Sequence, residues 1–140
     1  MKNIYTSIIA ITLIAFASQA QNTWTKKANF GGGTRGYAVG FTIGSKGYIS
    51  TGNNFADHDD CWEYDPTTNI WTQKANYGGG LTSSGEGFSI GSKGYLLGGG
   101  KTDFWEFDPV ANLWIQKANF PGAVRIWGVG FSIDNKGYIG

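Results

Sequence analysis

The densest group of polar side chains in this 140-residue chain lies between Asn53 and Asp60. Carboxylate and amide oxygens of this kind suit Ca²⁺, which prefers oxygen ligands. The spacing does not follow the Asp-x-Asp-x-Asp-Gly pattern of a calcium loop, and no glycine turns the chain inside the group, so we predict no metal site. Either a ligand-binding loop or a solvated acidic loop fits the composition. The candidate ligand-binding residues in this group are Asn53, Asn54, Asp57, His58, Asp59 and Asp60.

Three further charged residues could contact a ligand. Glu86 stands where two similar stretches of the chain have Val39 and Val129. A carboxylate at such an apolar position must be paired or must face a solvent-filled channel. Arg35 and Arg125 suit a carboxylate ligand because a guanidinium group offers a rigid fork of donors. They could equally tie loops down, and Glu86 could simply form an ion pair with one of them. No catalytic residue is predicted.

An internal repeat indicates which elements position these residues. The period is 47 residues from Trp24 to Trp71 and 43 residues from Trp71 to Trp114. Repeats of this size are typical of propellers and of open repeat arrays. The first motif is Trp24–Phe30, Trp71–Tyr77 and Trp114–Phe120, and the second motif is Phe41–Tyr48, Phe88–Tyr95 and Phe131–Tyr138.

The difference between the two periods falls in one place, between Asn53 and Asp60. An insertion confined to one connection marks a loop on an otherwise fixed frame. The candidate residues are therefore positions at which the copies differ, whereas the turns Gly-Ser-Lys-Gly and Asp-Pro are repeated. In an up-and-down sheet the longer connections share one face, and we predict that any ligand contact is there.

The pattern within one copy predicts an all-β fold. No stretch after Ala20 keeps a helical apolar period, and short apolar runs are bounded by Gly, Asn and Asp-Pro. Four antiparallel strands per repeat are typical of a propeller blade. We expect the repeated glycines on inner strands and the repeated tryptophans between blades. The strands predicted in the middle copy are 85–90, 95–97, 104–107 and 113–117, with tight turns at 91–94 and 108–112 and a further outer strand at 23–27.

These motifs resemble the kelch-repeat family, within the galactose-oxidase-like propellers, and specifically its bacterial secreted type. The resemblance covers residues 21–140. It implies an incomplete kelch-type β-propeller of about two and a half four-stranded antiparallel blades, with units at about 21–71, 72–114 and 115–140. It is carried by Gly98-Gly99, Phe107-Asp108-Pro109 and Trp114, and in the first copy by Thr51-Gly52, which has lost one glycine, Tyr64-Asp65-Pro66 and Trp71.

Kelch propellers commonly close with six or seven blades. The resemblance therefore implies that this chain is the N-terminal part of a longer propeller, whose remaining blades belong to the same polypeptide. It implies a scaffold that binds a protein or glycan ligand without catalysis. The alternative is a fragment of a carbohydrate-active enzyme such as a sugar epimerase, whose channel carries Arg, Glu and His; Arg35, Glu86 and Arg125 are compatible with that alternative.

The cysteine and histidine content limits the enzymatic alternative. Copper-radical sugar oxidases need a Cys–Tyr crosslink and several histidine ligands. Cys61 and His58 are the single cysteine and the single histidine of this chain, so that site cannot form within it. No cofactor is expected. Cys61 also leaves no intrachain disulfide, and we expect it to be a small buried residue.

Residues 1–20 read as a signal peptide. Lys2 precedes an apolar run over 4–17, and small residues at Ser18 and Ala20 precede a cut after Ala20. The run is shorter than the roughly 20 residues that a membrane span needs; the alternative is an uncleaved anchor. Removing Lys2 balances the 11 basic residues against the 10 acidic ones. We therefore expect no nucleic-acid partner, no membrane span after cleavage, and a secreted, periplasmic or cell-surface location.

Overall fold

The computed structural model describes residues 23–140, so the predicted signal peptide lies outside the described residues. Within this part of the chain every regular element is a β-strand, and no helix is long and apolar enough to cross a membrane. The strands are β1 (Val39–Ile43), β2 (Lys46–Ser50), β3 (Cys61–Asp65), β4 (Ile70–Lys74), β5 (Glu86–Ile90), β6 (Lys93–Leu97), β7 (Phe104–Asp108), β8 (Leu113–Gln116), β9 (Gly130–Ile133) and β10 (Lys136–Ile139).

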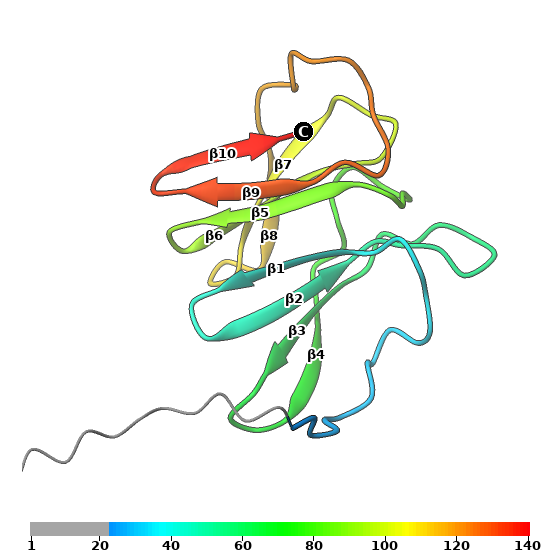
Figure 1. Cartoon of the computed structure of the whole chain (residues 1–140), viewed down its shortest axis with the longest axis vertical. Coiled ribbons are helices and arrows are strands. Elements are labelled where there is room, and N and C mark those ends of the chain that lie inside the picture. The colour runs from blue at the N-terminus through cyan, green and yellow to red at the C-terminus, as the bar shows by residue number, and fades with distance from the viewer. Residues whose placement is uncertain (1–22) are drawn as a thin grey trace, which may run out of the picture.

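The strands form successive antiparallel sheets in chain order. Strands β1 to β4 make one four-stranded sheet, β5 to β8 make a second, and β9 pairs with β10. Figure 1 shows β1, β5 and β9 side by side as the inner strands of the three units. We call the units blade 1, blade 2 and the third unit. This all-β, propeller-like arrangement confirms the strands predicted for the middle copy, apart from their ends; the turn predicted at 91–94 is shorter, because Lys93 already pairs with Ile90.

The Asp-Pro turns on the short-connection face are held by bonds from backbone N–H groups to the aspartate and by a left-handed asparagine. The Asp108 carboxylate accepts a hydrogen bond from the backbone N–H of Val110, over 2.9 Å. Asn112 closes the turn with a φ of 52°, in the left-handed region that asparagine tolerates. The Asp65 turn of blade 1 repeats the arrangement, with the Thr67 N–H donating over 2.8 Å. These turns set the register of the outer strand pair in each blade.

The core is the interface between blades 1 and 2. The ring of Tyr48 on β2 meets Phe107 on β7 edge-on, with centroids 5.7 Å apart, and Phe41 on β1 meets Trp114 on β8 at 6.5 Å. Cys61 is completely buried in the same cluster. Burial raises the pKa of the Cys61 thiol to about 12, which leaves it unreactive at neutral pH. The predictions of a buried cysteine and of aromatic residues between blades are confirmed.

The repeated glycines let the blades approach. A Cβ added at Gly94 on β6 would overlap the Phe41 ring, and one added at Gly137 on β10 would overlap the Phe88 ring. The two glycines occupy the same repeat position, and so do the two phenylalanines. The inner strand pairs of blade 2 and of the third unit thus each receive an aromatic ring of the preceding blade directly against their backbone.

The outer strand predicted at 23–27 is wrong for the structure described here. Thr23–Lys27 is irregular, and Trp24 is fully exposed. A strand satisfies its backbone groups only against a neighbour, and none of the described strands pairs with this segment. The nearby Ala28 N–H donates instead to the Asn69 side chain over 2.9 Å, which fixes the start of the first loop.

The inter-blade packing predicts unequal effects of one substitution at two repeat positions. Gly94→Ala should destabilise the protein by about 1–3 kcal/mol, because the added methyl forces Phe41 out of its packed position. Gly47→Ala is the matched control, since a Cβ there meets nothing within 4 Å. Urea unfolding measures both free energies. Equal effects of the two substitutions would contradict the packing account.

Candidate functional site

Apart from Glu86, which begins strand β5, the candidate residues lie on the face formed by the longer connections. We call this surface the long-loop face; it comprises residues 28–38, 51–60, 75–85, 98–103 and 117–129. Backbone hydrogen bonds join its loops into one layer. The Gly36 N–H donates to Asn53 O over 3.0 Å, and the Gly52 N–H donates to Thr82 O over 3.1 Å. The face is therefore a built surface and not a set of independent loops.

Arg35 is at the centre of this layer, with only 3% of its side chain exposed. Its guanidinium group donates to both carboxylate oxygens of Asp60, to Gly32 O and, over 3.1 Å, to Thr51 O. It also lies over the Phe30 ring, 5.2 Å from the centroid. This network occupies most of the donors of Arg35. The side chain holds loops together and offers little to a ligand.

Asp60 completes the network. The Trp62 indole N–H donates to its second carboxylate oxygen over 2.7 Å, beside the bond from Arg35. Partial burial acts to raise the pKa of Asp60, but the hydrogen bonds from Arg35 and Trp62 outweigh it, and the pKa is lowered. Asp60 is therefore a charged structural partner over the neutral range.

The inserted loop uses its polar residues internally. Asn53 Nδ2 donates to Asp57 over 2.8 Å, and His58 shares a hydrogen bond of 2.6 Å with Asn54. The bond from Asn53 lowers the pKa of Asp57, with a smaller contribution from a hydrogen bond with Ser83. Asp59 accepts from Asn76 of the next loop over 3.1 Å. The polar candidates at 53–60 thus build a braced projection, which extends beyond the neighbouring connections in Figure 1.

The long-loop face also exposes large apolar residues, which are not among the candidates predicted from the sequence. Phe55 at the tip of the inserted loop is fully exposed, on a backbone with a φ of 88°. Tyr37 and Trp127 occupy one repeat position, and both have left-handed backbones and are largely exposed. Leu81 is exposed in the loop between blades 1 and 2. The signal that could have identified these residues from the sequence is a hydrophobic side chain in a loop that differs between the copies.

Glu86 is buried, with 2% of its surface exposed. Its Oε1 accepts the Gly128 N–H over 2.9 Å, while Oε2 has no hydrogen-bond partner. Burial raises the pKa of Glu86, and the bond from Gly128 offsets this only in part. No ion pair of Glu86 is found among residues 23–140. The carboxylate connects blade 2 to the third unit and is not presented to solvent.

Arg125 repeats the position of Arg35 in the third unit. It lies over the Phe120 ring, 5.0 Å from the centroid, as Arg35 lies over Phe30. Blade 2 has Thr82 at this position, and Lys101 takes over part of the role by donating to Gly79 O over 2.6 Å. Unlike Arg35, Arg125 has no carboxylate partner among residues 23–140, and its side chain donates only to the nearby Ala123 O over 3.4 Å. Arg35, Glu86 and Arg125 do not converge on one exposed point.

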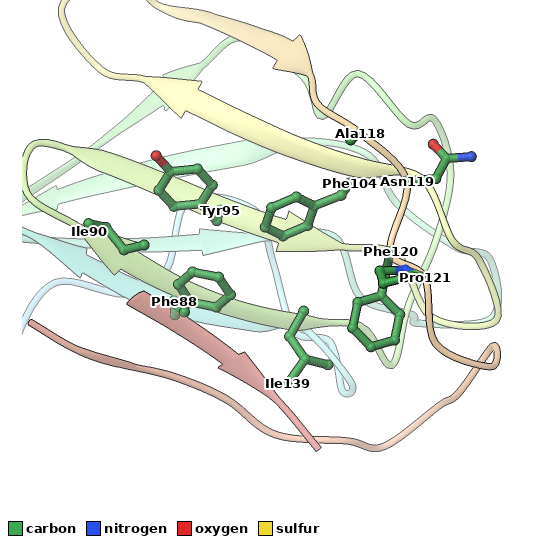
Figure 2. Close-up of a pocket in the computed structure, with 10 residues that line it drawn as sticks. Phe88, Ile90, Tyr95, Phe104, Ala118, Asn119, Phe120, Pro121 and Ile139 are labelled. Atoms are coloured by element: carbon green, nitrogen blue, oxygen red, sulfur yellow. The ribbon is translucent and has the colours of Figure 1, made fainter. Parts of the chain in front are cut away.

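Residues 23–140 have no candidate metal site, but they do form an apolar groove. No group of three or more His, Cys, Asp or Glu side chains is arranged to hold a metal ion. An apolar groove of about 410 Å³ lies between β5–β7 and the third unit, away from the predicted polar candidates. Figure 2 shows the Phe88, Tyr95 and Phe104 rings along one wall, with Phe120 and Ile139 opposite.

Comparisons with known proteins bear on the fold alone. No family model and no curated protein matches the chain. A solved structure, that of YjhT, is similar with a TM-score of 0.76 and 19% sequence identity. The similarity covers 86% of this chain and 49% of that one, so the chain spans about half the length of YjhT. At this identity the likeness supports the all-β, propeller-like architecture described above.

The Arg35 network predicts a large and pH-dependent loss of stability. Arg35→Met should destabilise the protein by about 2 kcal/mol, because it strands the partly buried Asp60 carboxylate. The lowered pKa means that Asp60 stabilises the fold above its ordinary value of 3.8 and loses this effect as the pH falls toward the lowered pKa. The deficit of Arg35→Met should therefore shrink in acid. Urea unfolding of the variant and the wild type at pH values from about 3 to about 7, which bracket the ordinary pKa of aspartate, measures this deficit in stability.

The control is Lys46→Met, which breaks the more exposed 2.7 Å ion pair with Glu63. Exposed pairs contribute about 1 kcal/mol or less. If Arg35→Met costs no more than Lys46→Met at neutral pH, the bracing role of Arg35 is wrong.

The burial of Glu86 predicts the opposite dependence of stability on pH. Its raised pKa makes its contribution to stability greatest below the ordinary value of 4.5 and progressively lost as the pH rises through the folded-state pKa. Glu86→Gln removes that loss, so its Tm should exceed the wild-type Tm by roughly 3 °C at neutral pH and by less in acid. Glu63→Gln should show the reverse, because hydrogen bonds from Lys46 and Tyr48 outweigh burial and lower the pKa of Glu63. If the difference in Tm between Glu86→Gln and the wild type does not change with pH, the pKa of Glu86 is not raised.

Proposed function

We propose that the chain is a secreted, kelch-type scaffold that binds a protein or glycan ligand on its long-loop face. One observation supports the proposal: Tyr37, Phe55, Leu81 and Trp127 project from four connections of a surface that hydrogen bonds hold together. Exposed aromatic residues on rigid loops contribute contact area at little entropic cost. Export rests on the charged, apolar and small-residue pattern of residues 1–20.

The backbone at Phe55 favours a binding role over a folding role. A non-glycine residue with φ near 88° is strained, and strain of this kind costs about 1–3 kcal/mol. The Phe55 ring is fully exposed and so gains no burial in return. The surrounding loop is braced by the Asn53–Asp57 and Asn54–His58 bonds, which hold the ring away from the body. A residue that costs stability without packing fits a contact made only in a complex.

The enzymatic alternative has less support. A catalytic site needs polar groups that converge on a reacting atom. The Arg35 guanidinium group already donates to Asp60 and to loop carbonyls, and the Glu86 carboxylate is buried against Gly128. No other feature of residues 23–140 favours a sugar epimerase, and the scaffold function stands as the conclusion.

The test compares Phe55→Gly with Val110→Gly. Val110 is similarly exposed but lies on the opposite, short-connection face. Phe55→Gly should raise the free energy of unfolding by about 1 kcal/mol, because glycine relieves the strain. A ligand is first identified on a glycan array or in a panel of purified extracellular proteins. Phe55→Gly should lower the affinity for that ligand by more than about tenfold.

Val110→Gly should leave that affinity unchanged. If Phe55→Gly binds as tightly as the wild type, or if Val110→Gly weakens binding as much, the long-loop face is not the binding surface.

A further inference from the structure

The inserted loop at 53–60 is held by hydrogen bonds to the connections on both sides of it. On one side, Asn54 Nδ2 donates to Thr34 O over 3.2 Å. On the other side, the Thr82 N–H donates to His58 O over 3.1 Å. Both neighbouring connections belong to the described part of the chain. A loop that is fixed in this way loses little conformational entropy when it binds a partner.

The tip of this loop is apolar and exposed. The Phe55 side chain is fully exposed, and the neighbouring Ala56 is exposed as well. The loop extends beyond the neighbouring connections in Figure 1. A second exposed apolar residue, Leu81, lies beside the base of the loop, because it directly precedes Thr82. A phenyl ring on a fixed, projecting loop has the shape of an anchor that enters a pocket of another molecule.

The amide groups of the loop are already engaged within the protein. Asn53 Nδ2 donates to Asp57, and Asn53 Oδ1 accepts the Phe55 N–H over 3.1 Å. The Asn54 amide is bonded at both ends too, to a backbone carbonyl and to the His58 ring. Specific recognition of a polar ligand such as a sugar needs placed polar groups, usually within a concave pocket. A convex tip whose amides are occupied therefore suits a pocket on a protein better than it suits a glycan.

Two carboxylates next to the tip have no ion-pair partner among residues 23–140. They belong to Asp57, which is exposed, and to Asp59, which is half-buried. Asp60, by contrast, is paired with Arg35. The tip therefore presents the Phe55 ring with uncompensated negative charge beside it.

Two cationic side chains act on Asp57 without forming an ion pair with it. Lys101 attracts Asp57 weakly through space, but its ammonium group donates to Gly79 O over 2.6 Å. His58 contributes a similarly small attraction when it is protonated. The hydrogen bond from Asn53 is the main reason that the pKa of Asp57 is lowered. Asp57 therefore carries its charge throughout the neutral range.

We propose that Phe55 and the two carboxylates beside it form the anchor for a protein partner that has an apolar pocket bordered by Lys or Arg side chains. The pocket encloses the Phe55 ring, and its basic border pairs with Asp57 and Asp59. Leu81 extends the apolar contact at the base of the loop. This proposal rests on the proposed function of the long-loop face, and it names the class of ligand.

The two kinds of contact have different roles. Enclosing the Phe55 ring removes apolar surface from water and supplies most of the affinity. Opposite charges around the ring steer the approach of the partner and fix its orientation. The same carboxylates disfavour an anionic lipid surface, which attracts basic segments.

The recognition chemistry can be tested with a defined host in place of the partner. β-Cyclodextrin has an apolar cavity that encloses a phenyl ring, and a derivative with a guanidinium group on every glucose unit adds a basic rim. The NMR signals of the Phe55 ring, identified by their absence from Phe55→Gly, report on this site alone. They should shift with both hosts, and the guanidinium host should bind about fivefold more tightly, as expected for exposed ion pairs.

Three controls separate charge, loop structure and sugar recognition. Asp57→Asn and Asp59→Asn should each reduce the preference for the guanidinium host, and an unchanged affinity for the neutral host shows that the loop is intact. Asp134→Asn removes a carboxylate from the exposed turn between β9 and β10, and it should alter neither affinity. Maltoheptaose, which has the same glucose units but no cavity, should leave the Phe55 signals in place.

The proposal is overturned if the Phe55 signals respond to neither host, or if the two hosts bind equally well. It is also overturned if maltoheptaose shifts these signals as strongly as the hosts do, because the loop then recognises a sugar surface. Binding of the wild type, but not of Phe55→Gly, to phosphatidylcholine vesicles would show instead that the anchor enters a membrane.

The proposed function can survive the failure of this proposal. If the ligand identified for the long-loop face is a glycan and Phe55→Gly weakens its binding, the scaffold function stands and the protein partner is wrong. If the ligand is a protein, raising NaCl from about 0.05 M to about 0.5 M should weaken its binding to the wild type, and by clearly less to Asp57→Asn. Equal salt dependence of the two would contradict a basic border around the pocket.

Discussion

The structure depends on one packing relation: an aromatic pair on the inner strands of one blade covers the next blade, whose backbone is bare there. Phe41 and Tyr48 stack with centroids 5.4 Å apart and present one flat apolar face. Gly94 allows that face to touch the backbone of blade 2. The same pair recurs as Phe88–Tyr95 and Phe131–Tyr138. Close packing of large aromatic residues supplies the apolar burial that short strands alone do not provide.

Ion pairs and hydrogen bonds fix the loops around these packed blades. Arg35 binds Asp60 and the loop carbonyls, and Asp60 in turn holds the Trp62 indole. Glu86 connects blade 2 to the third unit through the Gly128 N–H. Charged side chains that look like ligand contacts in the sequence are thus used to fix loops. The large apolar side chains that the long-loop face exposes include Tyr37, Phe55, Leu81 and Trp127.

Much of the fold could be predicted from the sequence because the copies constrain one another. A glycine or tryptophan kept at one repeat position indicates the same packing in each blade, and the structure confirms the strands, the Asp-Pro turns and the buried Cys61. The strand predicted at 23–27 from the same repeat is absent from the structure. Its tryptophan is repeated, but a strand also requires a neighbour, and pairing is a property of the tertiary structure.

The candidate site was less predictable for a physical reason. Departure from the repeat identifies a position that is free to differ, but it does not say whether the new side chain points outward. Arg35 and Glu86 differ from another copy and are buried, whereas Phe55 lies in the same inserted loop as the polar candidates and is exposed. Polar residue types drew attention to Asn53 and Asp57, whose hydrogen bonds only became visible with the loop conformation.

Native-state hydrogen exchange tests most directly whether the inter-blade interface holds the fold together. If it does, the amides of β2 and β6 open with the same free energy, because blades 1 and 2 unfold as one unit, while those of β9 and β10 exchange at a lower free energy. The third unit has the uncovered face that contains Phe131 and Tyr138. Independent opening of blades 1 and 2, with distinct free energies and denaturant dependences, would contradict this account.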